Sequence, residues 1–175
     1  MAPRAVHFIR HAQGYHNVHN DQTIPDPDLT PKGRKQCKHL STVLPYFDSI
    51  DLVCARTPAE PENTPSGIKR LQDEYGSIVN FERCYELSDY DSKTATFAPD
   101  GRHLEERATT LHKFLRDRKE EEIVVVSLGQ FLHYVSRDVD DDGKQIHGDW
   151  ENTEYRSYIF WPVGHEDALL KEMLC

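Results

Sequence analysis

The sequence contains few cysteines, no excess of basic residues and no long apolar run. Its four cysteines show no CxxC spacing, so we expect free thiols in a reducing compartment at Cys37, Cys54, Cys84 and Cys175. Lys and Arg number 21 against 30 Asp and Glu, and the formal charge of −9 disfavours nucleic acid and anionic membranes as main partners. No stretch approaches the roughly 18 apolar residues of a membrane-spanning helix, and the apolar stretch before Arg10 is too short for a signal peptide. We therefore expect a cytoplasmic protein.

Strands and helices are predicted to alternate along the chain. The 175 residues suit a single domain over residues 1–175. A domain of this size buries roughly 70% of the surface of its unfolded chain, so it needs no disulfide or metal to hold it together. Strands are predicted at 4–9, 49–55, 77–81, 123–127 and 155–161, and helices at 31–44, 66–75, 102–118, 129–135 and 166–174. This alternation predicts an α/β fold, a three-layer sandwich with a mostly parallel central sheet.

Three local patterns support this assignment. The run 123–126 holds four β-branched residues without alternation, which is typical of a central parallel strand buried on both faces. Thr30 before Pro31 marks a helix start, with the threonine as N-cap and the proline in the first helical position. In the helix 102–118 the apolar residues recur at i, i+4, i+7 and i+11 and form one stripe, which consists of Leu104, Ala108, Leu111 and Leu115.

Polar residues and glycine follow several of the predicted strands at the point where each strand ends. Ligands of open α/β sheets bind at the carboxyl ends of the strands, so these segments are expected to converge. They are Arg10 and His11 after the first strand, Arg56 after the second, Glu86 a few residues past the third, and Leu128, Gly129 and Gln130 after the central strand.

The first of these segments carries a resemblance to a known family. Arg10, His11 and Asn17 match the R-H-G-x-[ST]-x-x-N pattern of the histidine phosphatase (phosphoglycerate-mutase-like) superfamily. Ala12 stands where glycine is usual, and Gly14 where a hydroxyl residue is usual. Four longer segments resemble a fungal-type branch of that superfamily: HAQGYHN (11–17), PDPDLTPKGRKQC (25–37), IVVVSLGQFLHYVS (123–136) and NTEYRSYIF (152–160).

The resemblance implies a phosphoglycerate-mutase-like fold and phosphoryl-transfer chemistry. In that chemistry a neutral imidazole attacks phosphorus and becomes a phosphohistidine, arginines and a second histidine stabilise the developing charge, and a carboxylic acid protonates the leaving oxygen. Carried over by position, His11 matches the nucleophile, Arg10 and Asn17 the phosphate contacts, and Glu86 the proton donor, with Glu82 and Asp89 as alternative acids. No metal or cofactor is expected.

The position of the second histidine is occupied by Leu128, which can neither donate a hydrogen bond nor carry charge. Loss of one preorganised donor costs about 2.7–4 kcal/mol of barrier, or roughly 10²–10³ in rate. Gln130 replaces a usual glycine and brings a donor amide. After the second strand, CARTPAEP stands where the family usually has SPLRRT. Arg56 is therefore either a phosphate-binding arginine in a shortened segment or an exposed loop arginine. The stretch after Glu86 is also short for that branch, which implies an open pocket or one completed by a partner chain.

These departures leave three functions open. The first is a hydrolase or mutase-like enzyme that acts on small phosphate monoesters through His11. The second is a repurposed enzyme in which His11 and Glu86 act as an acid–base pair in an isomerisation, cyclisation or elimination. The third is a catalytically inactive binding protein. The expected partner is a small molecule, phosphorylated or not, and a homodimer paired through the strand 155–161 at an exposed sheet edge is a further option.

Other reactive side chains have plainer interpretations. His16 and His19 have i, i+3 spacing, but no HExxH signature accompanies them, so polar loop histidines are favoured over a metal site. The acidic run 138–142 lacks the spacing of a calcium loop and is interpreted as a solvated turn. Cys54 has no adjacent base and is interpreted as a buried thiol, and His133 as a structural residue of its helix.

Overall fold

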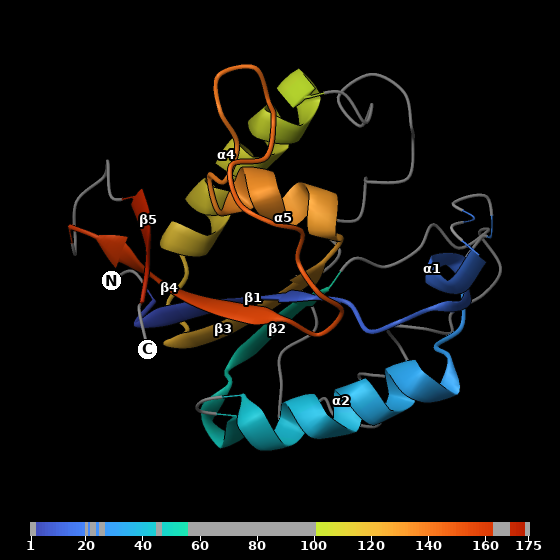
Figure 1. Ribbon diagram of the computed structural model, residues 1–175. Helices are drawn as coiled ribbons and strands as arrows, with labels where there is room; N and C mark the ends of the chain where they lie inside the picture. Colours follow the sequence, from blue (N-terminus) through green and yellow to red (C-terminus); the bar gives the residue numbers. More distant parts are fainter. Residues whose placement is uncertain are drawn as a thin grey trace, which may run out of the picture.

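Five strands form one sheet in the computed structural model, which describes residues 3–19, 21, 24, 27–44, 47–55, 101–162 and 169–173 (Figure 1). The strands are β1 (Ala5–Arg10), β2 (Leu52–Ala55), β3 (Glu122–Ser127), β4 (Tyr155–Trp161) and β5 (Leu169–Glu172). Their order across the sheet is β2-β3-β1-β4-β5. The strands β2, β3 and β1 run parallel, and β4 runs antiparallel to both of its neighbours. The sheet is mixed, and β3 lies between two parallel strands, as its composition predicts.

Helices cover both faces of this sheet. They are α1 (Tyr15–His19), α2 (Pro31–Val43), α4 (Gly101–Arg116) and α5 (Gly129–Val135), and a 3-10 turn, η1 (Phe47–Ser49), precedes β2. Figure 1 shows α2 on one face and the pair α4 and α5 on the other. The described elements therefore form three layers, which confirms the predicted α/β architecture.

Alternate residues of β3 fill the core on both faces of the sheet. Ile123 and Val125 belong to the larger core, which α4 and α5 complete. Val124 belongs to the smaller core on the α2 side, together with Ile9 and Leu44. A stretch that is apolar at four consecutive strand positions can serve two cores at once, and this explains the run of β-branched residues at 123–126.

The helix signals in the sequence appear in the structure as predicted. Thr30 is the N-cap of α2, where its side chain accepts a hydrogen bond from the Gly33 N–H, and Pro31 is the first helical residue. The apolar stripe of α4 is buried at all four of its positions, Leu104, Ala108, Leu111 and Leu115. This stripe packs against α5 and the sheet as one surface.

One polar cluster is buried within the sheet. The fully buried His7 of β1 has its Nδ1 2.8 Å from Ser157 Oγ on β4 and its Nε2 2.9 Å from Glu122 Oε2 on β3. Glu122 in turn pairs with Arg4 at 2.6 Å. The imidazole of His7 thus bridges three adjacent strands and satisfies polar groups that would otherwise be buried without partners.

The predicted helix at 166–174 is wrong for the residues described there, because Leu169–Glu172 form β5. This segment pairs antiparallel with β4, and Leu170 lies opposite Phe160 and packs against the larger core. Cross-strand pairing with a ready sheet edge outweighs the helix propensity of this short segment. β4 consequently lies between β1 and β5, so the prediction of an exposed edge at 155–161 is also wrong.

Smaller differences affect the loops. The short helix α1 lies within the predicted loop after the first strand, and β2 begins at Leu52, after η1. The predicted helix 66–75 and strand 77–81 lie outside the described residues. Within the described ranges, no helix is both long and apolar enough to cross a membrane. The single domain over residues 1–175 stays a prediction.

Candidate active site

Two loops meet at the carboxyl ends of β1 and β3. The strands are parallel and in register, with Arg10 opposite Ser127, so the residues that follow them leave the sheet side by side. The His11 N–H continues this pairing with a 3.1 Å hydrogen bond to the Ser127 carbonyl. His11 and Leu128 therefore occupy neighbouring positions at this edge of the sheet.

The half-buried imidazole of His11 has a defined tautomer when it is neutral. Its Nδ1 lies 2.9 Å from the Ala12 carbonyl oxygen, which can only accept, so Nδ1 carries the proton. The lone pair of the neutral ring is then on Nε2, the nitrogen that a nucleophile would use. The backbone is also fixed, because the Asn152 side chain donates to the His11 carbonyl at 2.9 Å.

The loop after His11 is tied to the start of α2. The Gln13 N–H donates to Gln36 Oε1 at 3.0 Å, and the Gln13 carbonyl accepts from the Thr30 N–H at 3.0 Å. The Thr30 hydroxyl also donates to Gln13 Oε1 at 2.9 Å. A loop with this many bonds holds the preceding histidine in one position, which is what preorganised catalysis requires.

Gly33 allows α2 to approach this loop closely. A Cβ atom added at position 33 would lie 2.1 Å from the Gln13 carbonyl oxygen, so only glycine fits against the loop backbone here. The helix and the loop are thus in direct contact through a residue without a side chain.

Asn17 shapes the same loop. Its Oδ1 accepts a 2.9 Å hydrogen bond from the Gly14 N–H, and its own N–H donates to the Gly14 carbonyl at 3.0 Å. Its side-chain oxygen thus closes the turn that follows His11, and the phosphate contact expected of Asn17 stays a prediction.

Arg10 lies between the two loops. Its Nη1 donates to the Trp150 carbonyl, and a Cβ added at Gly129 would lie 3.4 Å from Arg10 Cδ and Nε. The Arg10 side chain therefore packs against the backbone of Gly129 at the start of α5. The Arg10 Nε is buried and has no hydrogen-bond partner among the described residues.

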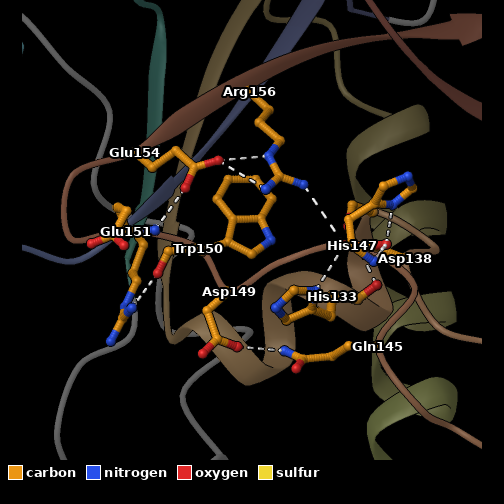
Figure 2. A network of polar contacts seen from close by, with 11 residues as sticks. His133, Asp138, Gln145, His147, Asp149, Trp150, Glu151, Glu154 and Arg156 are labelled. Atoms are coloured by element: carbon orange, nitrogen blue, oxygen red, sulfur yellow. Dashed lines mark hydrogen bonds and ion pairs between the residues drawn. The ribbon is translucent and has the colours of Figure 1, made fainter.

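A network of polar side chains lies next to Trp150 (Figure 2). The Arg156 guanidinium lies over the buried Trp150 ring, 4.0 Å from its centroid, and Arg156 Nε donates to Glu154 at 2.8 Å. Arg156 also faces Asp138, with Nη1 3.8 Å from Oδ2. The Trp150 carbonyl accepts a hydrogen bond from Arg10. The network that packs around Trp150 therefore also helps to hold the Arg10 side chain in place.

Asp138 is the anionic centre of that network. It is buried and lies 2.9 Å from Nδ1 of His133, while His147 donates to its other oxygen (Figure 2). Burial raises the pKa of the Asp138 carboxyl, but the hydrogen bonds from His147 and His133 outweigh burial and hold this pKa below its usual range. The solvated turn predicted for 138–142 is therefore wrong at Asp138, whereas residues 140–142 are exposed.

His16 lies next to His11, although its sequence context favours an ordinary loop histidine. Their ring centroids are 5.2 Å apart. Burial and the positive charge of Arg10 lower the pKa of His16 below its usual value, so the ring is neutral near pH 7. Its Nδ1 is buried and has no hydrogen-bond partner among the described residues. The proximity of the two rings depends on α1, which the sequence did not predict.

The second loop contributes little polar chemistry. Leu128 is in an extended conformation before α5, its side chain is 37% exposed and it makes no capping hydrogen bond. Gln130 is exposed on the first turn of α5. Arg56 and Glu86, as well as the alternative acids Glu82 and Asp89, lie outside the described residues. No group of three or more His, Cys, Asp or Glu side chains suited to a metal ion occurs in the part of the chain that the structure describes.

Comparison with solved structures identifies the fold. The chain superimposes on YhfR from Bacillus stearothermophilus with a TM-score of 0.62, at 15% identity over 97% of this chain and 95% of that chain. It also matches a mycobacterial glucosyl-3-phosphoglycerate phosphatase solved with VO3, with a TM-score of 0.57, at 14% identity over 98% of both chains. The chain has the phosphoglycerate-mutase-like fold.

A third example is a phosphoserine phosphatase from Entamoeba histolytica, solved with 3-phosphoglyceric acid. It matches this chain with a TM-score of 0.55, at 15% identity over 98% of this chain and 97% of that chain. No protein-family model and no curated protein sequence matches the chain. The structural neighbours include several phosphatases, and at these identities the likeness establishes the fold alone.

Proposed function

We propose that this protein hydrolyses small phosphate monoesters through a phosphohistidine formed on His11. The observation that carries the proposal is the His11 imidazole itself. Its Nδ1 is fixed by the Ala12 carbonyl at 2.9 Å, which leaves the lone pair on Nε2, and Arg10 precedes it at the end of β1. The neighbours of the same fold that are named as phosphatases support this choice of chemistry.

The proposed reaction has two steps. In the first, His11 Nε2 attacks phosphorus, the P–N bond forms, and the P–O bond to the leaving group breaks. A carboxylic acid, for which we propose Glu86 with Glu82 and Asp89 as alternatives, gives its proton to the leaving oxygen. In the second step, water attacks the phosphohistidine, the P–N bond breaks, and the acid regains its proton as phosphate leaves.

The phosphate contacts are proposals of the same kind. The guanidinium of Arg10, held by the Trp150 carbonyl, offers its remaining N–H groups to phosphate oxygens. We propose Asn17, Arg56 and the segment 128–130 as further contacts. Leu128 supplies no donor, and a site that lacks one preorganised donor loses about 10²–10³ in turnover unless another residue provides it.

A second function is favoured by one specific observation. The side chain of Leu128 is apolar, 37% exposed and next to His11 in the sheet register. This surface suits an organic substrate without phosphate, on which His11 and Glu86 would act as an acid–base pair in an isomerase, cyclase or lyase reaction. In either case we propose a small-molecule substrate and a cytoplasmic location.

The deciding experiment measures phosphate release from p-nitrophenyl phosphate. Wild-type protein should turn over slowly and form an acid-labile phosphohistidine detectable by mass spectrometry, and His11→Ala should abolish both signals. His39→Ala, at an exposed histidine of α2, is the matched control and should behave as wild type. If the wild type releases no phosphate and carries no phosphohistidine, the hydrolase proposal is wrong. An activity on a phosphate-free substrate that still requires His11 would then support the second function, and no such activity would leave a binding protein.

A further inference from the structure

The candidate site contains a second imidazole besides that of His11. It belongs to His16 of α1 and not to the loop after β3. α1 begins four residues after His11 and carries His16 back toward it, so that the two rings are tilted by 42° with centroids 5.2 Å apart. Both side chains are only half-buried and can face a ligand at this edge of the sheet.

The polar atoms of His16 have one unusual feature. Its Nδ1 is buried yet has no hydrogen-bond partner among the described residues. A buried polar atom without a partner destabilises the folded state, so such atoms are rare, and in native structures they call for an explanation such as a catalytic role. The ring next to His11 therefore has hydrogen-bonding capacity that the described residues do not use.

Gly14 provides the space for this ring. A Cβ added at position 14 would lie 2.7 Å from His16 Nδ1 and 2.8 Å from Cε1. The backbone of Gly14 does not have a positive φ, so its conformation alone does not require glycine. A side chain at position 14 would displace the imidazole of His16, so glycine leaves this ring in its place beside His11.

The charge at the site suits an anionic ligand. Burial, and after it the positive charge of Arg10, lowers the pKa of His16. A phosphate dianion would offset the charge of Arg10 and favour the protonated imidazole, which donates from both nitrogens. His16 can therefore change from a neutral group to a cationic donor when substrate binds.

We propose that His16 replaces the histidine absent at Leu128 as the second catalytic imidazole, donating a hydrogen bond to the phosphoryl group while His11 attacks. This inference rests on the proposed phosphohydrolase function and names the residue that stabilises its transition state. It also links two departures in the sequence: Leu128 removes an imidazole from one loop, and Gly14 makes room for an imidazole from the other.

The first experiment compares kcat for p-nitrophenyl phosphate in single variants. His16→Ala should lower kcat by about 10²-fold, the usual cost of one preorganised donor. His19→Ala, an exposed histidine in the same helix, is the matched control and should leave kcat unchanged. Adding Leu128→His to His16→Ala should restore kcat, because the imidazole returns from the other loop. A purely structural role for His16 would not produce this rescue.

The second experiment moves the ring without removing it. Gly14→Ala should lower kcat in the wild-type background and have no further effect in the His16→Ala background, which a double-mutant cycle measures. This cycle also keeps the proposal testable if His16→Ala folds poorly. If His16→Ala keeps wild-type kcat while His11→Ala abolishes turnover, the role of His16 is wrong and the hydrolase proposal stands. Turnover that survives His11→Ala would instead overturn the hydrolase proposal itself.

Discussion

The loops after β1 and β3 start from paired residues of parallel strands but are built differently. In the first loop, Gln13 donates a hydrogen bond to Gln36 and accepts one from Thr30, and Asn17 closes the turn. The second places the exposed, apolar Leu128 before α5 without any side-chain cap. Among the described residues, side-chain hydrogen bonds thus fix the loop that carries His11 but not the segment at Leu128. Within these residues, the groups that can stabilise charge at this edge belong mainly to that first loop and to Arg10.

The largest expected effect comes from making the two loops chemically alike. In the His16→Ala background, Leu128→His should raise kcat for p-nitrophenyl phosphate by about 10²–10³, because it returns one preorganised donor to the β3 side. The Leu128 side chain is 37% exposed, so the fold should tolerate the exchange. Leu128→Phe is the matched control, an aromatic ring without a donor, and should not raise kcat. Equal kcat values for the two variants would show that position 128 does not face the reacting group.

The next effect comes from disturbing the well-ordered loop. Replacing glycine by alanine within a helix usually stabilises a protein by about 0.4–1 kcal/mol. Gly33→Ala should instead destabilise this protein by about 1–3 kcal/mol, because the added Cβ would lie 2.1 Å from the Gln13 carbonyl oxygen. Urea unfolding measures the change, and Lys35→Ala, an exposed site in α2, should stay within about 0.5 kcal/mol of wild type. A stabilised Gly33→Ala variant would mean that α2 does not press on the loop.

The smallest effect tests the polar contacts of Asp138 with His133 of α5 and with His147. Asp138→Asn should lower the free energy of unfolding by about 1 kcal/mol at pH 7. The variant lacks the negatively charged carboxylate that forms hydrogen bonds with His133 and His147. The pKa of Asp138 is lowered in the folded state. Its contribution is therefore complete above the usual aspartate pKa of about 3.9 and is lost as the pH falls through the folded-state pKa.

Urea unfolding at pH 7 and near pH 3 separates this effect from a general loss of stability. The difference between wild type and Asp138→Asn should shrink at the lower pH. Asp141→Asn, at an exposed carboxylate of the following turn, is the matched control and should show no pH-dependent difference. A difference that stays constant between the two pH values would mean that the charge of Asp138 is unimportant to the fold.

Much of the fold could be predicted because its signals are local. The β-branched run of β3, the Thr30-Pro31 start of α2 and the stripe of α4 each depend on residues close in sequence. The meeting of the loops that carry His11 and Leu128 follows from strand order alone. β5 could not be predicted, since its pairing with β4 is a tertiary contact that overrides local propensity.

The surroundings of the candidate site were harder to predict, because they join distant segments. Asp138 looks like part of an acidic turn in the sequence, and only folding places it against His133 and Arg156. His16 looks like a loop histidine until α1 turns it toward His11. The spacing of such residues in the chain contains no signal of their contacts, although Gly14 and Leu128 both mark the site as unusual.

The buried His7 has a consequence for the geometry at the other end of its strand. Its two ring nitrogens form hydrogen bonds with Ser157 on β4 and Glu122 on β3, so these contacts specify the register of three strands. A shift of β1 by one residue would turn His7 toward the opposite, apolar face and leave Glu122 without this partner. The same shift would move Arg10 away from Ser127. The alignment of the two loops is thus specified from within the sheet, by a histidine that takes no part in the proposed chemistry.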